Sequence, residues 1–261
     1  MKQIFLILIL FLSLISSAQI TYFNSASTPA DNGTNTATTT AVTPPGSMTT
    51  GDIVIFIAYQ RGTAATIAIS EASGQTWSTA IARTASSTAI LTYAVFWCRY
   101  NGTWGSNPSV VFASGTSTSV VMHVFRPTNS TKVWALKDAG SSSRAAASPM
   151  SGSGLAPASM NTGDFGIAGW ITDDDNTMGA IGGTDAMTDM GSAQYRNTSG
   201  SDMSSSYAYK IPTGSFSPSS FTKTQATNGN DPYVNMYLEF TESDPAPANH
   251  NGGFFKIIKR Q

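Results

Sequence analysis

The densest group of acidic side chains in this sequence is the run Asp173-Asp174-Asp175-Asn176, which directly follows an apolar, strand-like stretch. Ca²⁺ binds about six to eight oxygen atoms from carboxylates and carbonyls, often on loops. These residues are therefore the best candidates for metal ligands, and Ca²⁺ is the one cofactor that the sequence suggests. The spacing matches no EF-hand loop, which alternates its ligands and ends on a distal glutamate. A solvated acidic loop without a metal is the alternative.

A second kind of chemistry would use aromatic rings that stack on sugar faces. Residues 101–108 form a turn-rich segment that carries Trp104, the tryptophan that we expect to be most exposed. Tyr100 directly precedes this segment. Tyr100 and Trp104 are therefore candidate glycan contacts, whereas the other tryptophans adjoin strand-like runs, where large aromatic side chains usually pack in the core.

Residues suited to catalysis are scarce. A glycosidase needs two carboxylates that face each other across a cleft, and Glu71, Glu239 and Glu242 are the only glutamates. No Gly-x-Ser-x-Gly elbow, His-Glu-x-x-His motif or phosphate-binding loop occurs. His123 lies in a strand-like run, and Cys98 reads as a buried thiol. We therefore expect no enzymatic activity, and a glycoside hydrolase-like enzyme is the least favoured alternative.

Strand-like runs must position these residues, because no amphipathic helical pattern follows residue 18. Apolar and β-branched runs punctuated by Gly, Pro, Asn and Ser predict many short strands. In the first half they cover residues 38–42, 53–60, 66–70, 90–100, 109–113 and 119–126, and in the second 165–172, 203–211, 221–225 and 233–241. This pattern predicts an all-β protein, a β-sandwich of jelly-roll-like type.

The sequence also repeats itself. Residues 45–52 recur as residues 157–164, and both copies have Thr-Gly-Asp directly before an apolar run. The motif Val-x-Met-x-Val at 120–124 is echoed at 234–238 as Val-x-Met-x-Leu. We expect Gly51 and Gly163 to adopt a positive φ in a tight turn. Asp52 and Asp164 should accept backbone N–H bonds there. The repeat predicts two homologous halves, residues 19–136 and 137–241, as one duplicated sandwich or two packed ones.

Residues 1–18 have the order of a signal peptide, with a basic start, an apolar run and small residues before Gln19. The run is shorter than the roughly 20 residues of a membrane-spanning helix. We therefore expect a secreted or cell-surface protein with no membrane span in the mature chain, and an uncleaved anchor is the alternative.

Composition narrows the classes of partner. Charged residues make up 11% of the chain, with a net charge of −1, against about 25% charged residues in ordinary soluble domains. No basic stripe is present to neutralise phosphates, so we expect no nucleic-acid partner. The single cysteine rules out an internal disulfide.

Three motifs carry a resemblance. A Gly-Asp-apolar strand, the turn Ser73-Gly74-Gln75-Thr76-Trp77 and an aromatic strand that leads into Asn-Gly-x-Trp resemble duplicated β-sandwich modules of secreted bacterial surface proteins and tailed-phage structural proteins. The similarity covers about residues 25–240, and the second half lacks both tryptophan motifs. The resemblance implies an architectural or adhesive role and supplies no catalytic residues.

Residues 242–261 form a Pro-containing linker followed by an apolar-basic segment with Phe254, Phe255, Ile257 and Ile258. This segment resembles the last strand of the sorting domain of the type IX secretion system. The alternative is an arm that docks on the body or on a neighbouring subunit.

These observations together predict an extracellular, non-catalytic structural or adhesive protein of a cell surface, fibre or virion. Its partners would be further copies of itself or other surface or virion proteins. A secreted glycan-binding module is the second interpretation, with a cell-surface glycan as the partner.

Overall fold

The computed structural model describes residues 19–63, 66–70, 73–113, 116–152, 155–225 and 230–246. The predicted signal peptide at 1–18 and the arm residues Phe254, Phe255, Ile257 and Ile258 lie outside the described residues. The described part is all-β, as predicted. No helix in it is long and apolar enough to cross a membrane.

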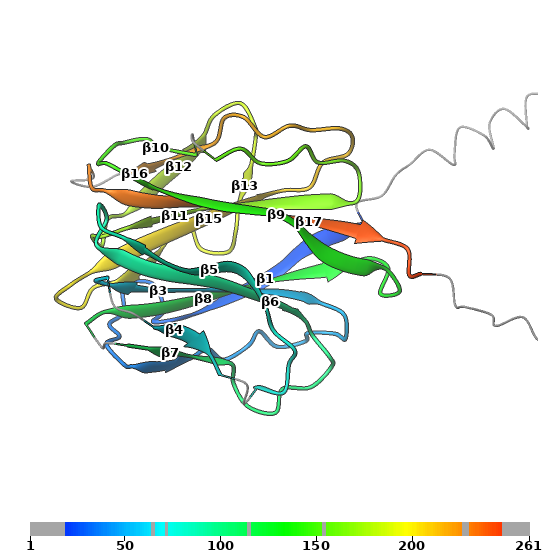
Figure 1. Ribbon diagram of the computed structural model, residues 1–261, viewed down its shortest axis with the longest axis horizontal. Coiled ribbons are helices and arrows are strands. Elements are labelled where there is room, and N and C mark those ends of the chain that lie inside the picture. The colour runs from blue at the N-terminus through cyan, green and yellow to red at the C-terminus, as the bar shows by residue number, and fades with distance from the viewer. Residues whose placement is uncertain are drawn as a thin grey trace, which may run out of the picture.

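The strands form four sheets stacked as layers (Figure 1). Sheet A has the order β1-β8-β3-β6-β5 and sheet C the order β2-β7-β4. Their strands are β1 (Ile20–Thr28), β2 (Thr39–Ala41), β3 (Ile53–Arg61), β4 (Ile67–Ile69), β5 (Ser78–Ser86), β6 (Leu91–Arg99), β7 (Ser109–Phe112) and β8 (Thr118–Pro127).

The second half forms the other two sheets. Sheet B has the order β13-β15-β11-β17-β9, with β14 also on β15, and sheet D the order β10-β16-β12. Their strands are β9 (Val133–Arg144), β10 (Met150–Ser151), β11 (Asp164–Thr172), β12 (Met178–Gly182), β13 (Thr188–Asp189), β14 (Tyr195–Asn197), β15 (Met203–Lys210), β16 (Thr222–Gln225) and β17 (Tyr233–Ser243).

Each half has the strand order of a jelly roll. Strands β1, β8, β3 and β6 are neighbours in one sheet and β2, β7 and β4 in the other, and β9, β17, β11, β15 and β10, β16, β12 repeat this order. The strand β5 departs from a regular jelly roll because it pairs with β6. The common ancestry of the halves stays a prediction, while their shared strand order is an observation.

Sheets A and B face each other, so the protein consists of two packed sandwiches in the order C-A-B-D (Figure 1). The central core between A and B contains Ile53, Ile55 and Tyr59 of β3 with Phe165 and Ile167 of β11. Outer cores fill the spaces between A and C and between B and D. Because β3 and β11 are buried on both faces, their sequences are nearly continuous apolar runs rather than alternating ones.

The repeated turn has the predicted geometry. Gly51 and Gly163 have φ values of 93° and 97°. The Asp52 carboxylate accepts the Thr49 N–H at 2.8 Å, and the Asp164 carboxylate accepts the Asn161 N–H at 2.9 Å. The two copies differ in their basic partner, since Asp52 pairs with an arginine of β8 and Asp164 with a lysine of β9.

One predicted echo between the halves is wrong. Val120, Met122 and Val124 pack in the outer core between sheets A and C. Val234, Met236 and Leu238 instead face the central core. A shift of one residue exchanges the two faces of a strand, so the two motifs match in letters and not in structural position.

Two strands, β9 and β10, lie at and just after the predicted division between the two halves. The strand β9 begins at Val133 and ends at Arg144, so it crosses the predicted division between residues 136 and 137. Its second part reads Gly-Ser-Ser-Ser, which has low strand propensity. Pairing with β17 forms the strand nevertheless.

Candidate functional site

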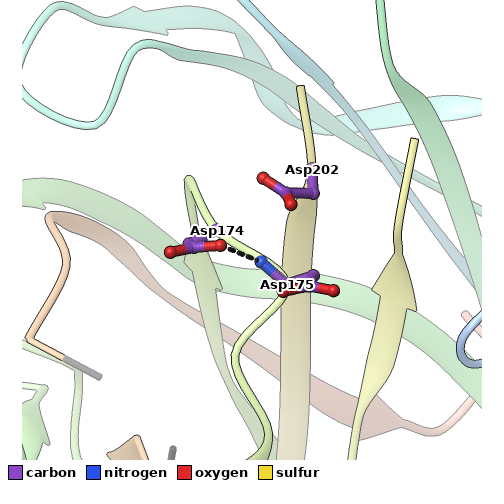
Figure 2. Close-up of side chains that lie close together, drawn as sticks. All are labelled: Asp174, Asp175 and Asp202. Carbon is purple, nitrogen blue, oxygen red and sulfur yellow. Dashed lines mark hydrogen bonds between the residues drawn. The ribbon is translucent and has the colours of Figure 1, made fainter. Parts of the chain in front are cut away.

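The acidic site lies where β11 ends and β15 begins (Figure 2). Asp174 and Asp175 follow β11, and Asp202 directly precedes β15. The two strands are antiparallel, with Thr172 opposite Ser204, so the segments after β11 and before β15 meet at one edge. One carboxylate oxygen from each aspartate lies within 4.8 Å of the others. We name Asp174, Asp175 and Asp202 the acidic triad.

The backbone around the acidic triad is fixed by local hydrogen bonds. The Thr172 hydroxyl donates to the Asp174 carbonyl at 2.9 Å, and the Asp175 N–H donates to Asp174 Oδ1 at 2.8 Å (Figure 2). The remaining carboxylate oxygens are available for a ligand geometry of the kind that Ca²⁺ accepts. All three side chains are partly exposed, so a bound cation would complete its coordination with water.

The structure divides the predicted ligand set. Asp173 Oδ2 lies 3.6 Å from Nη1 of Arg61, a residue of β3 in the other half of the molecule. Asn176 is buried, and its amide donates to Gln225 Oε1 at 2.8 Å and to Asp231 Oδ2 at 2.6 Å. Asp173 and Asn176 are therefore bound to the protein itself, and only Asp174 and Asp175 join a cluster that could hold a metal.

Electrostatics at the acidic triad favour a positive ligand. Burial raises the pKa of Asp202, and the charges of Asp174 and Asp175 raise it further. Burial also raises the pKa of Asp173 to about 6, against the opposing charge of Arg61. A divalent cation would remove the repulsion among the three carboxylates.

Sequence reasoning missed Asp202, which lies 27 residues after Asp175 along the chain. Only the antiparallel pairing of β11 with β15 brings it there. One feature of the sequence could have revealed it. Asp202 directly precedes the strand-like run at 203–211, and that strand could have been expected to pair with the one that ends at the acidic run.

The candidate glycan contacts lie against the outer core of the first sandwich. Tyr100 is buried, and Trp104 is half-buried, not exposed as the sequence suggested. Their rings stack with centroids 5.0 Å apart, and Trp77 stacks on Trp104 at 6.4 Å. This stack covers the edge of the core between sheets A and C, and whether its exposed part contacts a sugar stays a prediction.

Comparisons with known proteins identify no relative. The chain matches no protein-family model, and neither curated proteins nor solved structures give a match. Its function must therefore be inferred from its own geometry.

Glu239, one of the glutamates considered for a hydrolase, is engaged in the scaffold. Glu239 of β17 is fully buried, and Lys137 Nζ lies 2.5 Å from its Oε1. The same ammonium lies 2.9 Å from Asp164 Oδ2. Burial raises the pKa of Glu239, and the neighbouring lysine opposes that shift. This network ties β9 and β17 to the repeated turn, and Glu71 lies outside the described residues.

Proposed function

We propose that this chain is an extracellular, non-catalytic structural or adhesive protein, exported and displayed on a cell surface, fibre or virion. The observation that supports this most directly is the four-layer arrangement with one continuous central core. Such a core holds the two sandwiches in a fixed orientation, as a structural spacer requires. The loops at the ends of the sandwiches are then available for contacts with other molecules.

The use of charge in the described residues is consistent with a scaffold. Three buried carboxylates, those of Asp52, Asp164 and Glu239, pair with Arg126 or Lys137 and fix turns and strand edges. Two recesses among the described residues lie at or below the lower end of the roughly 300–1,000 Å³ of sites for small molecules. The one beside residues 138–141 measures about 210 Å³, and the one at residues 212–216 measures about 300 Å³.

Light scattering on residues 19–261 tests the proposal. We expect concentration-dependent multimers, which electron microscopy should show as regular assemblies. A monomer at every concentration that binds an immobilised glycan would favour the second candidate, a glycan-binding module, for which the half-exposed Trp104 stack is the supporting feature.

Calcium is expected to stabilise the protein through the acidic triad. Extracellular calcium sites have dissociation constants of about 0.1–1 mM. Calcium at about ten- to hundredfold this value would add about 1.5–3 kcal/mol to the free energy of unfolding. Differential scanning fluorimetry should show a higher Tm in calcium than in EDTA.

Two matched variants decide whether the triad is responsible. Asp202→Asn should abolish the calcium-dependent rise in Tm, whereas Asp173→Asn, which alters the pair with Arg61, should retain it. Equal Tm values in calcium, magnesium and EDTA would show that the triad is a solvated acidic loop.

A further inference from the structure

The strand β9 presents an open edge. It lies at the end of sheet B and pairs with β17 from Val133 opposite Ser243 to Arg144 opposite Tyr233. No described strand pairs with its other side. An edge of this length is a template for another chain, because its outward N–H and C=O groups can extend the hydrogen-bonded ladder.

A recess accompanies this edge. Its lining comprises residues 138–141 of β9, residues 155–157 of the loop before β11, and Tyr237. The Asp138 carboxylate accepts the Ala158 N–H at 2.9 Å and so holds the loop beside the strand. We name this space the β9 recess. Its volume of about 210 Å³ is below that of typical small-molecule sites and is enough for a single side chain. Its lining is mixed, with polar groups of Asp138 and Ser141 beside the apolar surfaces of Leu155, Pro157 and the Tyr237 ring.

The surroundings of the β9 recess are acidic. Asp138 of its lining interacts with Glu239, and Glu239 and Asp164 both pair with Lys137, which gives these four residues a formal charge of 1 − 3 = −2. An occupant with positive charge would therefore be favoured over a neutral or acidic one.

The chain itself contains a segment of matching chemistry. Residues 254–258 read Phe-Phe-Lys-Ile-Ile, and Lys256, Lys259 and Arg260 supply three positive charges without an acid. Aromatic and β-branched residues favour strands, and alternate side chains of a strand point to one face. An added strand gains affinity from its main chain and specificity from alternate side chains in pockets.

We propose that residues 254–258 of one copy add as a strand to β9 of a second copy, with Phe255 in the β9 recess. This inference rests on the proposed function and names its partner, a second copy of this chain. Docking on the same copy would require the chain to reverse its direction within residues 244–253, after Ser243, which lies opposite Val133. Pro245 and Pro247 follow at once, and proline and the residue before it favour extended backbone. A head-to-tail contact of this kind joins two different surfaces and so builds a chain of copies, which is a filament unless the rotation between copies closes it into a ring.

Two variants of residues 19–261 test the two sides of this contact separately, one in the recess and one in the arm. Ala156→Trp fills the β9 recess from an exposed loop position, and Phe255→Asp removes the apolar side chain of the arm. Each variant alone should be monomeric by light scattering at concentrations where the native chain forms multimers. Ala41→Trp, at an exposed position of β2 on sheet C, is the matched control and should still form multimers.

A mixture of the two variants provides the decisive measurement. Ala156→Trp keeps an intact arm and Phe255→Asp keeps an intact recess, so together they should form heterodimers and nothing longer. If the Ala156→Trp variant forms the same multimers as the native chain, assembly uses another surface, and the docking proposal fails while the proposed function stands. If the native chain is monomeric at every concentration, both fail.

Discussion

Replacing Phe165 with alanine is expected to lower the free energy of unfolding by about 3–5 kcal/mol. Phe165 of β11 is fully buried in the central core. Its ring lies 4.5 Å from that of Phe125, 4.9 Å from that of Phe240 and 5.5 Å from that of Trp134, measured between centroids. Phe125 belongs to the first sandwich and the other two to the second. The substitution therefore removes contacts on both sides of the central core and leaves a cavity between the sandwiches.

Urea unfolding followed by tryptophan fluorescence and circular dichroism measures this loss. The matched control is Phe216→Ala, because Phe216 is half-exposed on a loop beneath Lys210. That change should cost about 1 kcal/mol or less. Equal losses for the two variants would contradict a central core that couples the sandwiches.

Acidification is expected to destabilise the protein through His123, by about 3 kcal/mol between about pH 7.5 and pH 4. His123 is fully buried in the central core, and its Nε2 has no hydrogen-bond partner among the described residues. Burial lowers its pKa from 6.5 to about 3. Its ring faces Tyr22, Tyr195 and Tyr207, and Tyr22 Oη lies 3.3 Å from Nδ1.

The direction in which stability changes with pH follows from proton binding to His123 in the folded and unfolded chains. Between about pH 6.5 and pH 3 the unfolded chain holds a proton on His123 that the folded chain does not, so stability falls as the pH falls. Asp173 acts in the opposite direction, because burial raises its folded pKa to about 6. The loss of unfolding free energy that His123 causes on acidification must therefore be measured as a difference between two variants, because one curve of stability against pH contains both effects.

His123→Leu is the informative variant. His123 pairs with Ile55 of β3, and Leu238 holds the corresponding place opposite Ile167 of β11. The leucine variant should lose less stability than the native chain between about pH 6.5 and pH 4 in denaturant titrations. Parallel pH curves for the two proteins would show that His123 is not buried as a neutral ring.

The all-β class and most long strands followed from sequence pattern, because strands buried on both faces require runs of apolar residues. The predicted runs 53–60, 90–100, 119–126, 165–172, 203–211 and 233–241 correspond to β3, β6, β8, β11, β15 and β17. The short strands β10, β12, β13 and β14 and the long strands β1, β5 and β9 were not predicted. The long ones lie at sheet edges, where partial exposure admits Ser, Thr and Asn, and neither alternation nor apolar character distinguishes such segments from loops.

The candidate site was only partly predictable for a related reason. The sequence identified Asp174 and Asp175 because acidic residues adjoin one another along the chain. It also placed Asp173 and Asn176 with them, since a run of like residues does not reveal that one side chain turns to Arg61 and another to Gln225. Asp202 reaches the triad through strand pairing, which composition and spacing do not encode.

By itself, the sequence determined the fold class and the geometry of the repeated turn. Those features depend on local backbone preference and on the burial of apolar runs, which neighbouring residues in the chain specify. The tertiary structure alone decided that sheets A and B face each other, that Val120 and Val234 lie on opposite faces, and that the β9 edge stays open beside its recess. These features depend on contacts between segments far apart in the chain. The face on which Val120 or Val234 lies also depends on strand register, because a shift of one residue exchanges the two faces.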